Sequence, residues 1–119
     1  MRFMILVKAT RDSEAGVMLS EECFAALARY HEQLARAGVL LDVNSLQPSA
    51  KGWRLKSCAG RLTVSDGPFV GEDIVAAYAV IDVKSKEEAL EWARRFPNAR
   101  HTDVEIEVRP MLEPDGGGR

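Results

Sequence analysis

The sequence predicts a single α+β domain of the ferredoxin-like, split βαβ type with an inserted β-hairpin. Two apolar runs without polar alternation, 3–8 and 74–83, are typical of the central strands of a sheet. Two segments with helical spacing of apolar residues, 20–37 and 85–96, alternate with strand-like runs. Because 119 residues suffice for one core, we assign 1–112 to this one domain.

The first half of the chain contains a strand, a helix and a second strand. Residues 3–8 are apolar on both faces, which predicts a central strand. Residues 11–19 are predicted to form a polar loop, after which Ser20 provides an N-cap for a helix. Gly38 suits the left-handed conformation that ends a helix, and the run 39–46 is predicted to be the second strand.

A hairpin and the other central strand follow. The short runs 53–57 and 61–65 are predicted to pair through a turn at Cys58-Ala59-Gly60. The apolar run 74–83 is predicted to be the second central strand. Helices cover only one face of a four-stranded sheet, so the other apolar face of these strands requires a cover, and a second subunit is the simplest.

The C-terminal part contains a helix, an edge strand and a tail. Ser85 and Glu88 fit a capping box, and Pro97 ends the helix that follows. Residues 103–111 alternate strictly between apolar and polar, which predicts an edge strand with one solvated face. The tail, 113–119, offers nothing to bury and is expected to be disordered.

Composition excludes several classes of function. A net charge of -2 and a pI near 5.7 argue against a nucleic-acid-binding domain. The N-terminal apolar run is too short for a signal peptide or membrane span, so we expect a cytoplasmic protein. Cys23 and Cys58 are isolated thiols, and no phosphate loop, dinucleotide motif, zinc motif or nucleophile elbow is present. With only His31 and His101 available, we expect neither a metal nor a cofactor.

His31 is the first candidate catalytic residue. Its spacing places it on the apolar stripe of the first helix, where the environment controls the pKa of an imidazole. One interpretation is a general base or acid at the floor of a cleft, oriented by the carboxylate of Asp66 or Asp42. The other is a core histidine that hydrogen-bonds to a backbone carbonyl.

Asp66 is the second candidate, at the start of the tetrapeptide Asp66-Gly67-Pro68-Phe69. An Asp at the start of a turn accepts a hydrogen bond from the N–H two residues on, but Pro68 has none. Asp66 is therefore free to bind the Phe69 N–H, a neighbouring arginine, His31 or a ligand. Alternatively the tetrapeptide is a rigid strand-entry turn, with Phe69 plugging the core.

The hairpin is a candidate binding element. Arg54 and Lys56 share one side of its first strand, and such a pair could hold a small acidic ligand or an acidic partner. The alternative is a solvated face. Trp53, Tyr78 and Phe69 are the aromatic candidates for an apolar binding pocket, although aromatic residues at strand spacing also suit a core.

These residues carry a resemblance. The tetrapeptide at 66–69 is similar to the signature of the DGPF branch of the YCII-like superfamily of small bacterial α+β proteins. The other segments that resemble this superfamily are 4–10, 30–41, 47–49, 83–92 and 107–110. The resemblance implies a homodimer in the form of a dimeric α/β barrel. In YCII-like relatives a histidine and an aspartate are proposed as a catalytic pair, with that histidine near the position of Leu27.

The activity stays open among three classes, the last of which is a purely structural dimer unit with neither ligand nor partner. Likeness to muconolactone-isomerase-like barrels implies a cofactor-independent enzyme that transfers a proton on an acidic organic substrate, with His31 as base and Asp66 as its partner. The alternative is a non-catalytic accessory protein. Genes of this family often lie beside extracytoplasmic-function sigma factors, which implies a sigma factor as a regulatory partner.

Overall fold

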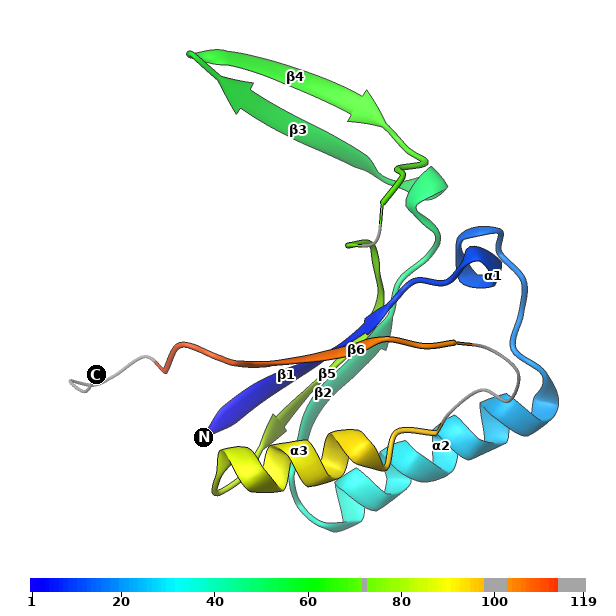
Figure 1. Ribbon diagram of the computed structural model, residues 1–119, viewed down its shortest axis with the longest axis vertical. Helices are drawn as coiled ribbons and strands as arrows, with labels where there is room; N and C mark the ends of the chain where they lie inside the picture. The colour runs from blue at the N-terminus through cyan, green and yellow to red at the C-terminus, as the bar shows by residue number, and fades with distance from the viewer. Residues whose placement is uncertain (72, 98–102, 114–119) are drawn as a thin grey trace.

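The computed structural model describes residues 1–71, 73–97 and 103–113. Within these residues, four strands form an antiparallel sheet in the order β2-β5-β1-β6, and β3 and β4 form a separate pair (Figure 1). The α+β class is confirmed, and the strand order is that of the split βαβ plan. The strands are β1 (Arg2–Lys8), β2 (Leu40–Ser45), β3 (Trp53–Cys58), β4 (Arg61–Asp66), β5 (Val75–Asp82) and β6 (Ile106–Pro110). The helices are α1 (Arg11–Glu14), α2 (Glu21–Arg36), α3 (Lys86–Arg94) and the 3-10 turn η1 (Ser49–Lys51).

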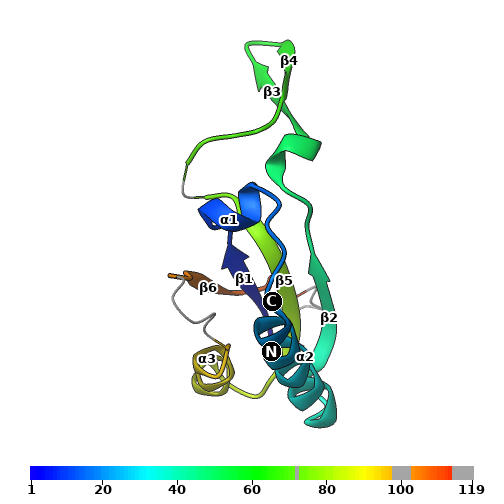
Figure 2. The same ribbon diagram turned by 90° about the vertical axis from the view of Figure 1, so that its right-hand side faces the viewer.

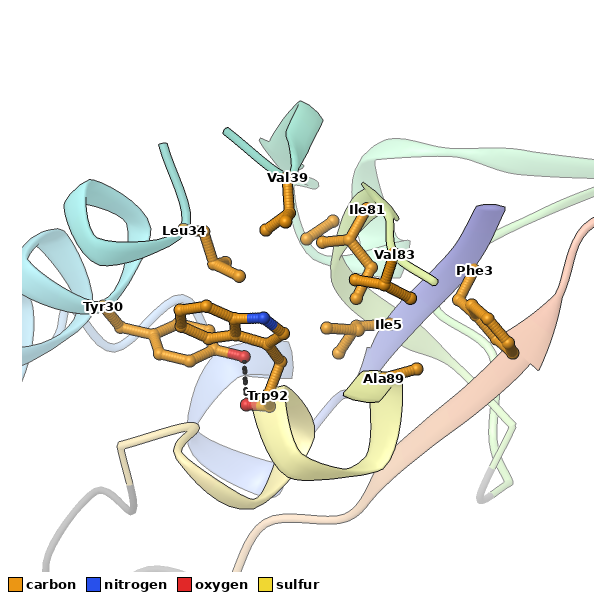
Figure 3. Close-up of a cluster of buried hydrophobic side chains, with 10 residues drawn as sticks. Phe3, Ile5, Tyr30, Leu34, Val39, Ile81, Val83, Ala89 and Trp92 are labelled. Atoms are coloured by element: carbon orange, nitrogen blue, oxygen red, sulfur yellow. Dashed lines mark hydrogen bonds between the residues drawn. The ribbon is translucent and has the colours of Figure 1, made fainter. Parts of the chain in front are cut away.

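The core lies between one face of the two central strands, β1 and β5, and the helices α2 and α3. Figure 3 shows side chains from all four elements converging there. The Tyr30 hydroxyl donates a hydrogen bond to the Trp92 carbonyl oxygen at 2.7 Å and so links the two helices. Burial raises the pKa of Tyr30 to about 12. The buried apolar residues are Phe3, Ile5, Tyr30, Leu34, Val39, Ala79, Ile81, Val83, Ala89 and Trp92.

The ends of α2 and α3 are capped as the sequence predicts. The hydroxyl of Ser20 accepts a backbone N–H at the start of α2, and Gly38 follows its last turn with φ of 76°. The hydroxyl of Ser85 accepts the Glu88 N–H at 3.1 Å. In a capping box the Glu88 carboxylate would accept the N–H of Ser85 itself. Here it accepts the N–H of Lys84, the residue before the cap, at 3.0 Å.

The expected loop at 11–19 begins with a helix instead. Thr10 and Ser13 cap α1 reciprocally: the Ser13 N–H bonds to Thr10 Oγ1 at 3.1 Å, and the Thr10 N–H bonds to Ser13 Oγ at 2.8 Å. The single turn of α1 buries no residue, so no apolar periodicity marked it in the sequence. Glu14 is its last residue.

The predicted hairpin is confirmed, with Cys58 as the last residue of β3 and Ala59-Gly60 as a two-residue turn. Both turn residues have positive φ, 53° and 78°, as a type I′ turn requires. All residues of β3 and β4 are exposed. The hairpin projects from the domain (Figures 1 and 2), and the radius of gyration, 16.4 Å, exceeds the roughly 13.5 Å of a compact domain of this length.

The sheet has a second face that no helix covers within the described residues. Side chains alternate along a strand, so Met4, Leu6, Tyr78 and Val80 point away from the core. We call this surface the open face. All four side chains are only partly buried, which agrees with the prediction that both central strands are apolar on two sides.

The last strand is an edge strand, as predicted, but it begins at Ile106 rather than 103. Glu113, assigned to the tail from sequence, accepts the Arg2 N–H at 2.9 Å. Residues 114–119 of the expected tail, and His101, lie outside the described residues. In the part of the chain that the structure describes, no helix is long and apolar enough to span a membrane.

Candidate functional site

His31 lies on α2 directly after the buried Tyr30, with the two ring centroids 6.0 Å apart. The imidazole is half-buried, and this burial lowers its pKa from the ordinary value of 6.5. Among the described residues, none forms a hydrogen bond with it. Within the described residues, His31 therefore has neither the backbone carbonyl partner of a core histidine nor the carboxylate that would orient a base, and its role as a base stays a prediction.

Asp66 lies far from His31 within one chain. It is the last residue of β4, opposite Trp53 and exposed, whereas α2 lies at the other end of the molecule (Figure 1). The structure does not bring the two predicted catalytic residues together. Asp66 does not bind the Phe69 N–H either, because that N–H donates to the hydroxyl of Ser49 at 2.9 Å.

The tetrapeptide at 66–69 packs against η1. The Gly67 N–H donates to the Gly52 carbonyl at 3.0 Å. A Cβ at position 67 would lie 1.8 Å from the Ser49 carbonyl oxygen, so only glycine fits there. These contacts favour the structural interpretation of the tetrapeptide, as the turn that fixes the base of the hairpin.

Glu14 completes this junction and was not predicted from sequence. Its carboxylate accepts hydrogen bonds from the Ser49 hydroxyl and from the Ser49 N–H, the latter at 2.9 Å. These bonds lower the pKa of Glu14. Glu14 and Ser49 are 35 positions apart in a region without periodicity, so no sequence signal connected them.

Three predicted binding residues lie at the base of the hairpin, with Arg54 and Phe69 on one face of β3 and Trp53 on the other. The Arg54 guanidinium carbon lies 4.0 Å from the centroid of the Phe69 ring. Phe69 therefore packs beneath Arg54 and lies outside the core cluster, contrary to the expectation that it plugs the core. Trp53 points to the opposite face of β3 and is 65% exposed.

Asp42 and Tyr78, in contrast, come together on the open face. Asn44 faces Tyr78 across β2 and β5, and Asp42 faces Val80. The Tyr78 hydroxyl donates to Asp42 Oδ2 at 3.2 Å. The Asn44 amide donates to the Tyr78 hydroxyl at 3.0 Å and to Asp42 Oδ1 at 3.2 Å. We call these three residues the polar triad; Asn44 was missed, although its i+2 spacing from Asp42 marked the shared face.

Charged residues border the open face on its other edge. Glu107 of β6 lies beside Leu6 and binds Lys8 Nζ at 3.3 Å and an Arg109 nitrogen at 3.2 Å. Hydrogen bonds from Arg109 and Lys8 lower the pKa of Glu107. Tyr78 lies two strands away from Glu107, which is about 10 Å at the usual strand spacing. The apolar floor between them has the width of a small organic molecule.

A pocket of about 380 Å³ opens beside Lys8, at the end of β1. Lys8 and Arg11 contribute cations to its lining, and Asp103 and Glu105 contribute carboxylates. The pocket therefore offers groups of both signs next to the charged edge of the open face. Among the described residues, no three His, Cys, Asp or Glu side chains gather closely enough to hold a metal ion.

The lowered pKa of His31 has a consequence for stability. The unfolded chain binds the proton near pH 6.5, whereas the folded chain binds it only at lower pH. The contribution of His31 to the free energy of unfolding should therefore be constant above pH 6.5 and decrease as the pH falls from 6.5 to the folded-state pKa.

Urea denaturation of the wild type and of His31→Gln at pH 5 to 8 measures this effect. Below pH 6.5 the free energy of unfolding should decrease less in the variant than in the wild type. Parallel stability profiles for the two proteins would contradict the lowered pKa.

Comparison with known proteins gives two matches. The family model described as "YCII-related domain" matches residues 1–113. An uncharacterized protein of Rhizobium meliloti (strain 1021), R00369, is 33% identical over 92 residues, which cover 76% of this chain and 74% of the relative. Both results concern most of the chain, including the polar triad and the hairpin.

Proposed function

The chain belongs to the family of YCII-related domain proteins, and from that premise we propose that it binds a small organic acid on the open face and transfers a proton on it without a cofactor. The observation that carries the proposal is the Tyr78 hydroxyl, which is held between Asp42 and Asn44. An acceptor and a donor side by side are the two groups that proton abstraction next to a carbonyl requires.

Each member of the triad has a role in this proposal. Asp42 accepts the proton from the carbon next to the substrate carbonyl. Tyr78 turns its O–H from Asp42 to the carbonyl oxygen and stabilises the negative charge that develops there. Asn44 binds both neighbours and holds them in position. Lys8, at the end of the central strand β1 and beside Glu107, attracts the carboxylate of the substrate in this proposal.

The proposal moves the base from His31 to Asp42, because Asp42 has hydrogen-bond partners and His31 has none among the described residues. It keeps the acidic substrate and the absence of a cofactor. It also keeps the homodimer, which is supported by the uncovered floor of Met4, Leu6 and Val80. The tetrapeptide at 66–69 supports placing the chain in the DGPF branch of its family.

Deuterium exchange tests the proposal without knowledge of the substrate. The protein is incubated in D2O with a panel of small keto acids and lactone acids, and loss of the acidic C–H signal is followed by proton NMR. The wild type should accelerate exchange for at least one acid. Asp42→Asn should reduce that rate by about 10²–10⁴-fold, and Tyr78→Phe by about 10²–10³-fold.

Glu87→Gln is the matched control, because it also neutralises one carboxylate but lies on the exposed side of α3. It should leave the exchange rate unchanged. An Asp42→Asn protein that is as fast as the wild type would remove the proposed base. A panel in which no acid exchanges faster with the protein than without it would count against the enzyme reading.

A further inference from the structure

The β3–β4 hairpin, residues 53–66, projects from the domain as a two-stranded sheet (Figures 1 and 2); we call it the arm. Paired residues point to the same side of a sheet, and successive residues point to opposite sides. Leu55 pairs with Val64, so both share one face with Trp53 and Leu62. These four large apolar side chains are more than half exposed: Trp53 65%, Leu55 56%, Leu62 62% and Val64 59%.

The opposite face of the arm is basic. It carries Arg54 and Lys56 on β3 and Arg61 on β4, with the hydroxyl groups of Thr63 and Ser65 between them and no acidic residue. In the part of the chain that the structure describes, none of the three cations forms an ion pair. The two faces of the arm therefore call for two different kinds of partner side chain.

The arm also has two free edges. Among the described residues, β3 and β4 pair with each other and with no further strand. A two-stranded hairpin is marginally stable in water, and a third strand that extends its apolar face makes such a sheet stable. An edge strand that presents unpaired N–H and C=O groups is a template for pairing with another chain.

The turn at the tip decides which peptide groups point outward. Cys58 and Arg61 flank the two-residue turn, so they form the hydrogen-bonded pair that closes it. Hydrogen-bonded and non-hydrogen-bonded pairs alternate along an antiparallel ladder, so Lys56 is a hydrogen-bonded position and Leu55 is not. The N–H and C=O groups of Leu55 therefore point away from β4, to the outer edge of β3.

We propose that the outer edge of β3 binds an extended segment of another protein in which acidic and apolar residues alternate. Side chains of the added strand opposite Trp53 and Leu55 extend the apolar face of the arm. Those opposite Arg54 and Lys56 lie on the basic face, where an acidic residue forms a cross-strand pair of opposite charge. Backbone bonds supply affinity in this binding mode, and alternate side chains supply specificity. The inference does not depend on the proposed function.

The chemistry of the arm favours this occupant over others. A nucleic acid would match the cations but leave the apolar face in water, and the net charge of -2 also disfavours it. A purely apolar surface would leave the cations unmatched. The edge of β3 is favoured over that of β4 because it presents two cations, Arg54 and Lys56, whereas β4 presents Arg61.

Two capped peptides as long as β3, six residues, test the alternation. One alternates glutamate and valine, and the other has the same composition with the glutamates in one block. Binding is measured by NMR titration of the full-length protein at physiological ionic strength. The alternating peptide should bind at least about ten-fold more tightly, because the block peptide places acids against the apolar face and valines against the cations.

Lys56→Glu and Arg61→Glu form a matched pair, because they reverse one charge each on the same face of the arm. Lys56 neighbours the added strand, so its reversal turns an attraction into a repulsion and should weaken binding at least about ten-fold. Arg61 lies two strands away, about 10 Å, which exceeds the Debye length of about 8 Å. Its reversal should change the dissociation constant by less than about three-fold. Circular dichroism checks the folding of both variants.

Amide hydrogen exchange locates the contact. The alternating peptide should slow exchange of the Leu55 N–H and leave that of Val64, on the outer edge of β4, unchanged. Equal binding of the two peptides, undiminished binding by Lys56→Glu, or protection of Val64 instead of Leu55 overturns the proposal. A Leu55 N–H that is already protected without peptide overturns it too, because the edge is then covered by a second copy. Tighter binding of a six-nucleotide oligothymidylate would assign the basic face to nucleic acid instead.

Discussion

Replacing Gly67 with alanine should lower the free energy of unfolding by about 3 kcal/mol, the upper end of the usual cost of overpacking. The added Cβ would lie 1.8 Å from the carbonyl oxygen of Ser49 and 2.7 Å from its carbonyl carbon. Both are backbone atoms, so no side-chain rotation relieves the clash. The chain must separate η1 from the turn, which breaks the bond from the Phe69 N–H to the Ser49 hydroxyl.

Two measurements detect this change. Urea denaturation gives the loss of stability, and amide hydrogen exchange at Phe69 reports on the junction itself. Gly52→Ala is the control: it adds the same methyl group in the same region, but its Cβ would lie 3.8 Å from the Ser49 carbonyl oxygen, an ordinary contact. Equal stability and equal Phe69 protection in the two variants would contradict the prediction.

Gly67 also shows what the sequence could reveal about this region. The absence of an N–H at Pro68 correctly drew attention to the turn, and the structural interpretation was one of two that remained open. The partner of the turn could not be predicted, because Ser49 and Glu14 meet it through tertiary contacts between irregular segments. Single hydrogen bonds of this kind leave no periodic pattern.

The fold was predictable to a larger extent because burial leaves a periodic pattern. The runs at 3–8 and 74–83 are apolar on both faces, which is the signature of central strands, and β1 and β5 are central. The caps Ser20 and Ser85 were predictable because their chemistry is local. The helix α1 was not, since a single capped turn without buried residues has no such pattern.

The candidate site was predictable only in part, for a geometric reason. Helix spacing placed His31 on the buried side of α2 but contained no information on the distance to Asp66. Asp42 and Tyr78 were both candidates, yet they were not linked, since their contact depends on the register of β2 against β5. Register follows from the pairing of whole strands, and it brought Asn44 into the site as well.

The second large effect concerns Leu34, which anchors α2 beneath the sheet. Its side chain is fully buried, at 0% exposure, within the cluster that joins both helices to β1 and β5. Leu34→Ala removes three carbon atoms from a packed interior and leaves a cavity. Substitutions of this kind cost about 2.7–5 kcal/mol, because the lost transfer energy adds to the cost of the cavity. Such a loss is a large share of the roughly 5–15 kcal/mol that stabilises a typical domain.

Leu90→Ala is the matched control, since it is the same substitution on the other helix at a side chain that is 45% exposed. It should cost less than about 1 kcal/mol, because solvent fills the space that the side chain leaves. Both variants should be compared with the wild type by urea denaturation at one protein concentration, because association couples stability to concentration. A Leu34→Ala protein as stable as Leu90→Ala would mean that α2 does not pack on the sheet through Leu34.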